Sequence, residues 1–138
     1  GLVCTLDGPA AASNSSTMED GRTSLRLAAS TMRRTVATSA VFTSSSVGRK
    51  GRAYWGAYGV SKFATEGLMQ TLADELEGVA PVRSNSINPG ATRTAMRAQA
   101  YPSENPQNNP LPEEIMPVYL YLMGPDSIGV NGQAFNAQ

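Results

Sequence analysis

The pattern that most limits the fold of this chain is a long helical segment, Tyr58 to Glu77, that is apolar on two sides. One side is an aliphatic stripe made up of Val60, Ala64, Leu68 and Leu72. The roughly opposite side carries Tyr58, Lys62, Met69 and Leu76. A helix that is apolar on both sides is normally covered on both. We therefore expect a sheet against one side, and another helix or a second subunit against the other.

Short strand candidates lie before and after this helix. Residues 40–43 precede it, and Val82 to Asn88 follows it and ends at a Pro-Gly turn. A further helix is expected from Pro112 to Gly124, and residues 132–136 form a last strand candidate. Strand, helix, strand, helix, strand at these lengths predicts an α/β fold with a parallel sheet.

Two stretches give weaker signals. Residues 97–112 contain four prolines among Asn, Gln and Ser, so we expect a long mobile loop there. Residues 1–38 are rich in Ala, Ser, Thr and Arg without a clear period, and the best helix candidate among them is Ser24 to Val36. Arginines without nearby acids give a faint transit-peptide signal. We favour a poorly ordered segment without strands, and we divide the chain into residues 1–38 and 39–138.

Composition excludes several classes of function. The chain has 138 residues and no histidine, which removes Ser-His-Asp and Cys-His nucleophile systems and the usual zinc ligand sets. Cys4 is the only cysteine, so no intrachain disulfide or cysteine metal cluster can form, and a reducing cytoplasm suits it. We expect no metal site, and proton chemistry must use Tyr, Lys, Ser or a carboxylate.

The charge and hydropathy patterns argue against large charged partners. Eleven basic residues balance eleven acidic ones, so the chain has no electrostatic footprint for nucleic acid or an anionic membrane. No apolar run approaches the roughly 20 residues needed to span a bilayer. Nucleic acid and an anionic membrane are therefore not expected as partners.

A phenol and an ammonium stand one helical turn apart at the start of the long helix. Tyr58 and Lys62 are four residues apart, which places them on one face. A free phenol is a poor acid–base at neutral pH, and a neighbouring ammonium stabilises its phenolate form. The pair is a candidate for general acid–base catalysis. Alone it is weak, because Tyr and Lys at this spacing occur on many surface helices.

Two further elements sit at predicted strand ends. Ser45 follows the first strand, at the carboxyl edge where open α/β sheets bind ligands. Its hydroxyl could hold a substrate oxygen, or Ser44, Ser45 and Ser46 could merely satisfy backbone groups. After the second strand, Pro89-Gly90 makes a turn at which a ligand can approach the backbone closely, with Thr94 four residues on. An ordinary strand-to-loop turn is the alternative.

In combination these elements resemble a known family. Ser45, Tyr58-x-x-x-Lys62 and Pro89-Gly90-x-x-x-Thr94 have the order and spacing of the classical short-chain dehydrogenase/reductases. The resemblance covers residues 39–138. It is closest to the YciK-type oxidoreductases within that family, in the runs 41–48, 62–67, 88–97 and 115–120. It implies the carboxyl-terminal half of a Rossmann domain with a doubly wound parallel sheet.

The resemblance also implies roles for individual residues. Tyr58 would be the general acid–base in hydride transfer between a nicotinamide cofactor, NADP or NAD, and a carbonyl or alcohol substrate. Lys62 would assist the phenol and bind the nicotinamide ribose, and Ser45 would orient and polarise the substrate oxygen. Family members form dimers and tetramers, so the two-sided helix would pack on a partner subunit in a homo-oligomer. The cofactor would also contact the turn after the second strand, through Pro89, Gly90 and Thr92 beside the nicotinamide and Thr94 near the phosphates.

Residues 1–38 depart from the family pattern. They contain no glycine-rich turn to seat a pyrophosphate at a helix N-terminus, so impaired cofactor binding is expected. The helical asparagine of the family would fall near Met18. We hypothesise a reading-frame error upstream in the gene, and translation of that DNA without family-like residues in any frame would refute it. Two rivals remain: an inactive chain that only pairs with other subunits, and a serine hydrolase, for which no Gly-x-Ser-x-Gly motif is found.

Overall fold

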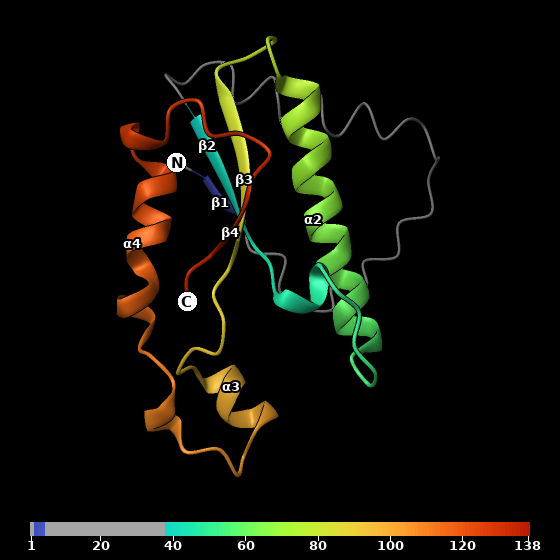
Figure 1. The fold of residues 1–138 in the computed structure, drawn as a ribbon, viewed down its shortest axis with the longest axis vertical. Helices are drawn as coiled ribbons and strands as arrows, with labels where there is room; N and C mark the ends of the chain where they lie inside the picture. The colour runs from blue at the N-terminus through green and yellow to red at the C-terminus, as the bar shows by residue number, and fades with distance from the viewer. Residues whose placement is uncertain (1, 5–37) are drawn as a thin grey trace.

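The computed structural model describes residues 2–4 and 38–138, which form a parallel α/β layer structure (Figure 1). Four strands pair in the order β1-β2-β3-β4, and every neighbouring pair is parallel. Within residues 38–138, three helices and three 3-10 turns lie between the strands. The strands are β1 (Leu2–Cys4), β2 (Thr38–Thr43), β3 (Val82–Asn88) and β4 (Ala134–Asn136). The helices are α2 (Gly56–Leu76), α3 (Ala95–Ala100) and α4 (Pro112–Met123), with 3-10 turns η1 (Ser46–Gly48), η2 (Pro106–Asn108) and η3 (Pro125–Ser127).

The sheet is covered by helices on both faces, as Figure 1 shows with α2 and α4 on opposite sides of the strands. Alternation along β2 divides the core, because successive side chains point to opposite faces. Ala40 and Phe42 pack with residues of α2, whereas Val41 packs with residues of α4. The α2 layer is completed by Met69, Leu72, Leu76 and Val82, and the α4 layer by Ile87, Ile115, Tyr119 and Leu122. The predicted α/β fold with a parallel sheet is therefore confirmed.

The buried side of α2 contains Lys62, Met69 and Leu76 of one predicted stripe but only Leu72 of the other. Gly59, Lys62, Glu66 and Met69 are among its buried residues, with Thr65, Leu72, Ala73 and Leu76. Val60, assigned to an aliphatic stripe, is 70% exposed, and Phe63 is 45% exposed. The sheet thus covers one face of α2 as expected. Among the described residues no second layer covers Val60 and Phe63.

Two expectations about irregular segments are wrong. Leu2–Cys4 pairs with β2 through the register Leu2↔Ala40 to Cys4↔Phe42, so the first segment does supply a strand. The predicted loop 97–112 begins within α3 and contains η2. The helix candidate Ser24 to Val36 lies outside the described residues, and the boundary between residues 38 and 39 stays a prediction. Within the described part of the chain, no helix has the length and apolarity to cross a membrane.

Candidate active site

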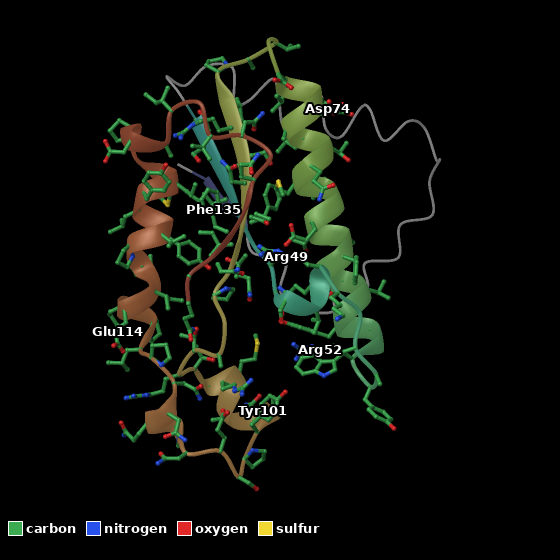
Figure 2. The ribbon with its side chains drawn as sticks, in the orientation of Figure 1. Arg49, Arg52, Asp74, Tyr101, Glu114 and Phe135 are labelled. Atoms are coloured by element: carbon green, nitrogen blue, oxygen red, sulfur yellow. The ribbon has the colours of Figure 1, made fainter. Side chains whose placement is uncertain are left out.

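A cavity of about 1000 Å³ opens at the carboxyl ends of β2 and β3. Its walls come from η1, the start of α2, the turn after β3, α3 and α4. In Figure 2, Arg52 and Tyr101 mark two of these walls, the loop before α2 and the end of α3. Every site residue predicted from the sequence lines this one cavity: Ser45, Tyr58, Lys62, Pro89, Gly90, Thr92 and Thr94.

Ser45 lies between the end of β2 at Thr43 and the start of η1 at Ser46. It is extended, caps η1, and its hydroxyl accepts a hydrogen bond from the Val47 N–H at 3.5 Å. Ser44 is 2% exposed and Ser46 is exposed, so only Ser45 of the three is half-buried. The buried hydroxyl of Ser44 has no hydrogen-bond partner among the described residues. Ser45 therefore combines access to the cavity with a fixed backbone, although its catalytic role stays a prediction.

Tyr58 and Lys62 lie on the first turns of α2, as the spacing predicts. The Lys62 Nζ lies 5.5 Å from the centre of the Tyr58 ring. Lys62 is only 4% exposed and donates a hydrogen bond to the Thr43 carbonyl at 3.3 Å, whereas Tyr58 is 39% exposed. The Trp55 ring packs against the Tyr58 ring with 5.6 Å between centroids. The site thus holds a buried ammonium beside an accessible phenol.

Hydrogen bonds fix the conformation of the turn after β3, which lines the cavity. Gly90 has φ +73°, a conformation that favours glycine, and its N–H donates to Asn88 Oδ1 at 3.2 Å. Thr92 is buried, and its hydroxyl reaches the Pro89 carbonyl at 3.4 Å. Gln138 Nε2 donates to that same carbonyl at 2.6 Å. These contacts fix the backbone that faces the cavity.

Another wall of the cavity comes from the segment that begins at Thr94 and contains α3. Thr94 caps α3 by accepting a hydrogen bond from the Arg97 N–H at 3.1 Å. The Arg97 guanidinium binds both oxygens of Glu104, at 2.6 and 2.7 Å, and Asn109 Nδ2 donates to Glu104 at 2.9 Å. Arg97 and then Asn109 lower the pKa of Glu104 to about 2, and the Glu104 contact raises that of Arg97. Met96, Arg97, Ala100 and Tyr101 of this segment line the cavity.

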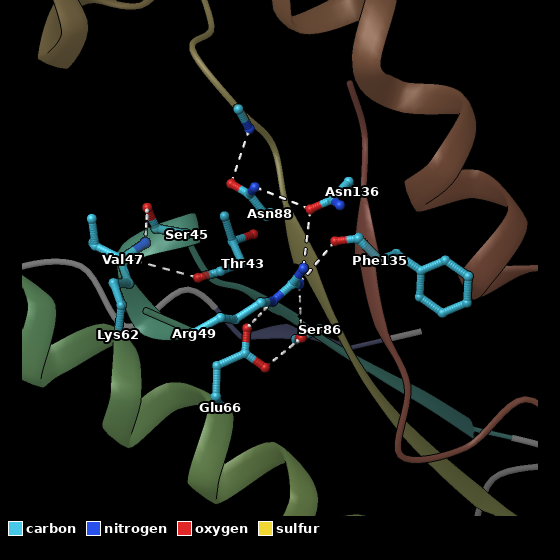
Figure 3. Close-up of polar contacts among 11 residues, drawn as sticks. Thr43, Ser45, Val47, Arg49, Lys62, Glu66, Ser86, Asn88, Phe135 and Asn136 are labelled. Atoms are coloured by element: carbon cyan, nitrogen blue, oxygen red, sulfur yellow. Dashed lines mark hydrogen bonds and ion pairs between the residues drawn. The ribbon is translucent and has the colours of Figure 1, made fainter. Parts of the chain in front are cut away.

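Sequence reasoning missed a charged cluster just behind the cavity, drawn in Figure 3. Arg49 Nε binds Glu66 Oε1 at 2.9 Å, and the Ser86 hydroxyl donates to Glu66 Oε2 at 2.7 Å. Because these residues are 17 and 20 positions apart, no local pattern joins them. The only sequence signal was Glu66, which lies one helical turn after Lys62, on a side of the helix that we expected to be covered. Among the described residues, no group of three or more His, Cys, Asp or Glu side chains could hold a metal ion.

Comparison with known proteins gives a consistent set of relatives. The profile of the short chain dehydrogenase family matches residues 23–105, which begins well before the predicted boundary at residue 39. The uncharacterised oxidoreductase YciK of Escherichia coli K12 is 63% identical over 100 residues, which are 72% of this chain and 39% of that protein. The chain thus spans about two fifths of that curated relative.

Solved structures agree in fold. A protein of Pseudomonas syringae assigned to the short chain dehydrogenases has 82% identity and a TM-score of 0.75, over 77% of this chain and 43% of that one. The yciK oxidoreductase of E. coli has 60% identity and a TM-score of 0.74, over 78% and 43%. A related crystal structure from E. coli CFT073, complexed with NADPH, has the same identity and TM-score over 78% and 44%.

Proposed function

Because this chain belongs to the short-chain dehydrogenase family, we propose that its cavity is the nicotinamide and substrate side of an NADP(H)-dependent oxidoreductase site. The observation that carries the proposal is that one cavity gathers Ser45, Tyr58 with Lys62, and the turn from Pro89 to Thr94. These residues come from three separate strand ends or helix starts. The carboxyl edge of a parallel sheet is where α/β folds bind such ligands.

The residues present fit the nicotinamide ribose end of the cofactor. The Lys62 ammonium is buried at the cavity wall, where it can donate to ribose hydroxyls. Gly90 also lines the cavity, with the Gln138 amide filling the space that a Gly90 Cβ would take, and Thr92 and Thr94 add hydroxyls beside it. We choose NADP(H) over NAD(H) because the E. coli CFT073 relative is complexed with NADPH.

In the proposed reaction, Tyr58 gives its phenolic proton to the carbonyl oxygen as that oxygen gains negative charge. Ser45 donates a hydrogen bond to the same oxygen and so orients the carbonyl. Lys62 stabilises the phenolate that remains, because its ammonium lies 5.5 Å from the ring centre. A nicotinamide cofactor held by Lys62 and the turn from Pro89 to Thr94 would supply the hydride for the carbonyl carbon. Alcohol oxidation runs through the same groups in reverse.

The substrate is a small carbonyl compound or the corresponding alcohol. Its body would contact the apolar part of the wall, which includes Met96, Tyr101, Ile115 and Tyr119. Residues 94–109, which contain α3, would cover the substrate. A reducing cytoplasm suits this enzyme, since Cys4 is its only cysteine.

A second candidate function is subunit pairing without catalysis. It is favoured by the outer face of α2, where Val60 is 70% and Phe63 is 45% exposed. Such a face is suited to a second copy of the chain in a homo-oligomer. Pairing alone requires neither cofactor nor Tyr58, which makes the two functions separable.

The test is NADPH-dependent reduction of a panel of carbonyl compounds by the purified chain, at high protein and cofactor concentrations. Tyr58→Phe should lower the rate by about 100-fold or more, because general acid catalysis contributes about that much. Tyr121→Phe is the matched control: this tyrosine is on α4, does not line the cavity and keeps its ring contact with Phe135 after losing the hydroxyl. Equal rates for the two variants would refute the assignment of Tyr58, and no reduction by any form would favour the pairing function.

A further inference from the structure

A buried carboxylate stands directly behind the cavity wall. Glu66 lies one helical turn after Lys62 on the buried face of α2 and is 5% exposed. Both of its oxygens are bonded, one to Arg49 Nε at 2.9 Å and the other to the Ser86 hydroxyl at 2.7 Å. Neither Arg49 nor Glu66 lines the cavity. Their contacts therefore act on the site only through the elements that they join.

Arg49, which directly follows η1, donates from its guanidinium to residues of three further elements, as Figure 3 shows. Besides Glu66 on α2, it donates to the Phe135 carbonyl at 2.9 Å and to Asn136 Oδ1 at 3.0 Å, both on β4. A longer contact of 3.5 Å reaches the Ser86 hydroxyl on β3. The guanidinium presents its donors in a rigid planar fork, so these contacts fix direction as well as distance.

From Asn136 the hydrogen bonds continue to the turn after β3. Asn88 Nδ2 donates to the same Asn136 Oδ1 at 3.1 Å, and Asn88 Oδ1 accepts from the Gly90 N–H at 3.2 Å. Asn88 and Gly90 both line the cavity. Arg49 is thus linked through two asparagines to the backbone on one side of the site.

The other side of the site is joined to Arg49 along the chain. Arg49 follows η1 directly, and η1 follows Ser45. Gly48 lies against α2 at Lys62: a Cβ built on it would be 2.7 Å from the Lys62 carbonyl oxygen. The Arg49–Glu66 pair therefore holds η1 on α2 where Ser45 and Lys62 must keep their relative position.

We infer that Arg49 and Glu66 are positioning residues, which hold the Ser45 and Lys62 side of the cavity in register with the turn at Gly90. The pair acts through η1 and α2 on one side and through Asn136 and Asn88 on the other. Its importance for turnover rests on the proposed oxidoreductase function, whereas the positioning itself is a property of the fold. A purely stabilising ion pair would strengthen the fold without setting the arrangement of the site.

Arg83→Lys is the matched control for Arg49→Lys. Arg83 is also a largely buried guanidinium with two partners, the Ser127 hydroxyl and the Gly124 carbonyl, but it lies on β3 away from the cavity lining. Both replacements keep the positive charge but lose the planar set of guanidinium donors. Glu66→Gln keeps an acceptor for Arg49 and replaces the acceptor of the Ser86 hydroxyl with an amide N–H that can donate to the same oxygen, whereas Glu66→Leu offers neither group.

The experiment measures amide hydrogen exchange by NMR at Gly48 and Gly90, together with the Tyr58-dependent reduction rate, well below each melting temperature. Arg49→Lys and Glu66→Leu should raise exchange at both glycines by about tenfold relative to Arg83→Lys, because only they loosen the site locally. The reduction rate should fall by about tenfold or more, since misplacement of reacting groups is costly. Arg83→Lys and Glu66→Gln should stay within about threefold of the unmodified chain in that rate.

Equal exchange at Gly48 and Gly90 in Arg49→Lys and Arg83→Lys would overturn the positioning role. So would a reduction rate that follows melting temperature alone across the four variants. If the unmodified chain shows no Tyr58-dependent reduction, the proposed function fails. The exchange rates still decide whether the pair positions the cavity.

Discussion

Gly48 lies where η1 meets α2, and this contact leaves no room for a side chain. A Cβ at this position would be 2.8 Å from the Lys62 carbonyl carbon and 2.9 Å from the Lys62 Cβ. These are atoms of a helix, so the neighbour cannot move aside as the end of a flexible side chain could. The same contact places Ser45, which precedes η1, relative to Lys62.

Gly48→Ala should therefore destabilise the chain by about 1–3 kcal/mol, the usual cost of overpacking. Gly51→Ala is the matched control, because a Cβ at Gly51 meets nothing within 4 Å. Urea unfolding followed by circular dichroism measures both free energies. Equal unfolding free energies for the two variants would show that η1 can shift away from Lys62 without cost.

Residues with local signatures could be placed from the sequence. The i,i+4 spacing of Tyr58 and Lys62 and the strand-end position of Ser45, read together with the family resemblance, indicated one site, and the three residues do line one cavity. Arg49 and Glu66 could not be predicted, because their contact depends on how η1 packs on α2. Nor does any local pattern place Gln138, which reaches back to the Pro89 carbonyl from the last position of the chain.

At the scale of elements, segments flanked by clear turn signals were predictable even when short: β4 (Ala134–Asn136) lies within the strand predicted at residues 132–136, whereas β1 was missed. The strand Val82–Asn88 was predicted with its observed bounds, and the long helix begins two residues earlier than expected, at Gly56. The strand Leu2–Cys4 has three residues, too few to show an alternation. It is a strand because it pairs with β2, a segment far along the chain, and local sequence does not predict that pairing.

The α3 segment was expected to be loop because prolines follow it closely. The segment is held by two contacts that the proline pattern does not predict: the Thr94 cap of α3 and the ion pair between Arg97 and Glu104. The low pKa of Glu104, about 2, means that this ion pair persists through most of the acidic range.

The Glu104 carboxyl should titrate near pH 2 in the folded chain, by ¹³C NMR, instead of near its ordinary value of 4.5. Since the folded pKa is the lower one, the contribution of the ion pair is present above the ordinary value and is lost as pH falls through about 2. Arg97→Met should raise this pKa more than Asn109→Ala, because Arg97 is the larger cause. A larger rise in the Asn109 variant would reverse the assignment of causes.

At the scale of the whole molecule, the described residues supply one end of the proposed dinucleotide site. The cavity holds the groups expected around a nicotinamide, at the carboxyl edge of β2 and β3. The sequence has no glycine-rich turn of the kind that seats a pyrophosphate on a helix N-terminus. Oriented N–H groups at such a terminus supply much of the affinity for a dinucleotide.

The 138-residue chain by itself should therefore bind NADPH weakly, with a Kd above about 100 μM. Reduced nicotinamide mononucleotide carries the nicotinamide end without the adenosine phosphate, and it should bind within about fivefold of NADPH if only that end is held. Fluorescence titration of both ligands measures the two affinities. Slow turnover is expected with weak binding, because correct placement of reacting groups can be worth roughly 7–11 kcal/mol of a barrier. NADPH binding with a Kd of about 1 μM, and far tighter than the mononucleotide, would mean that this chain contains a pyrophosphate site of its own.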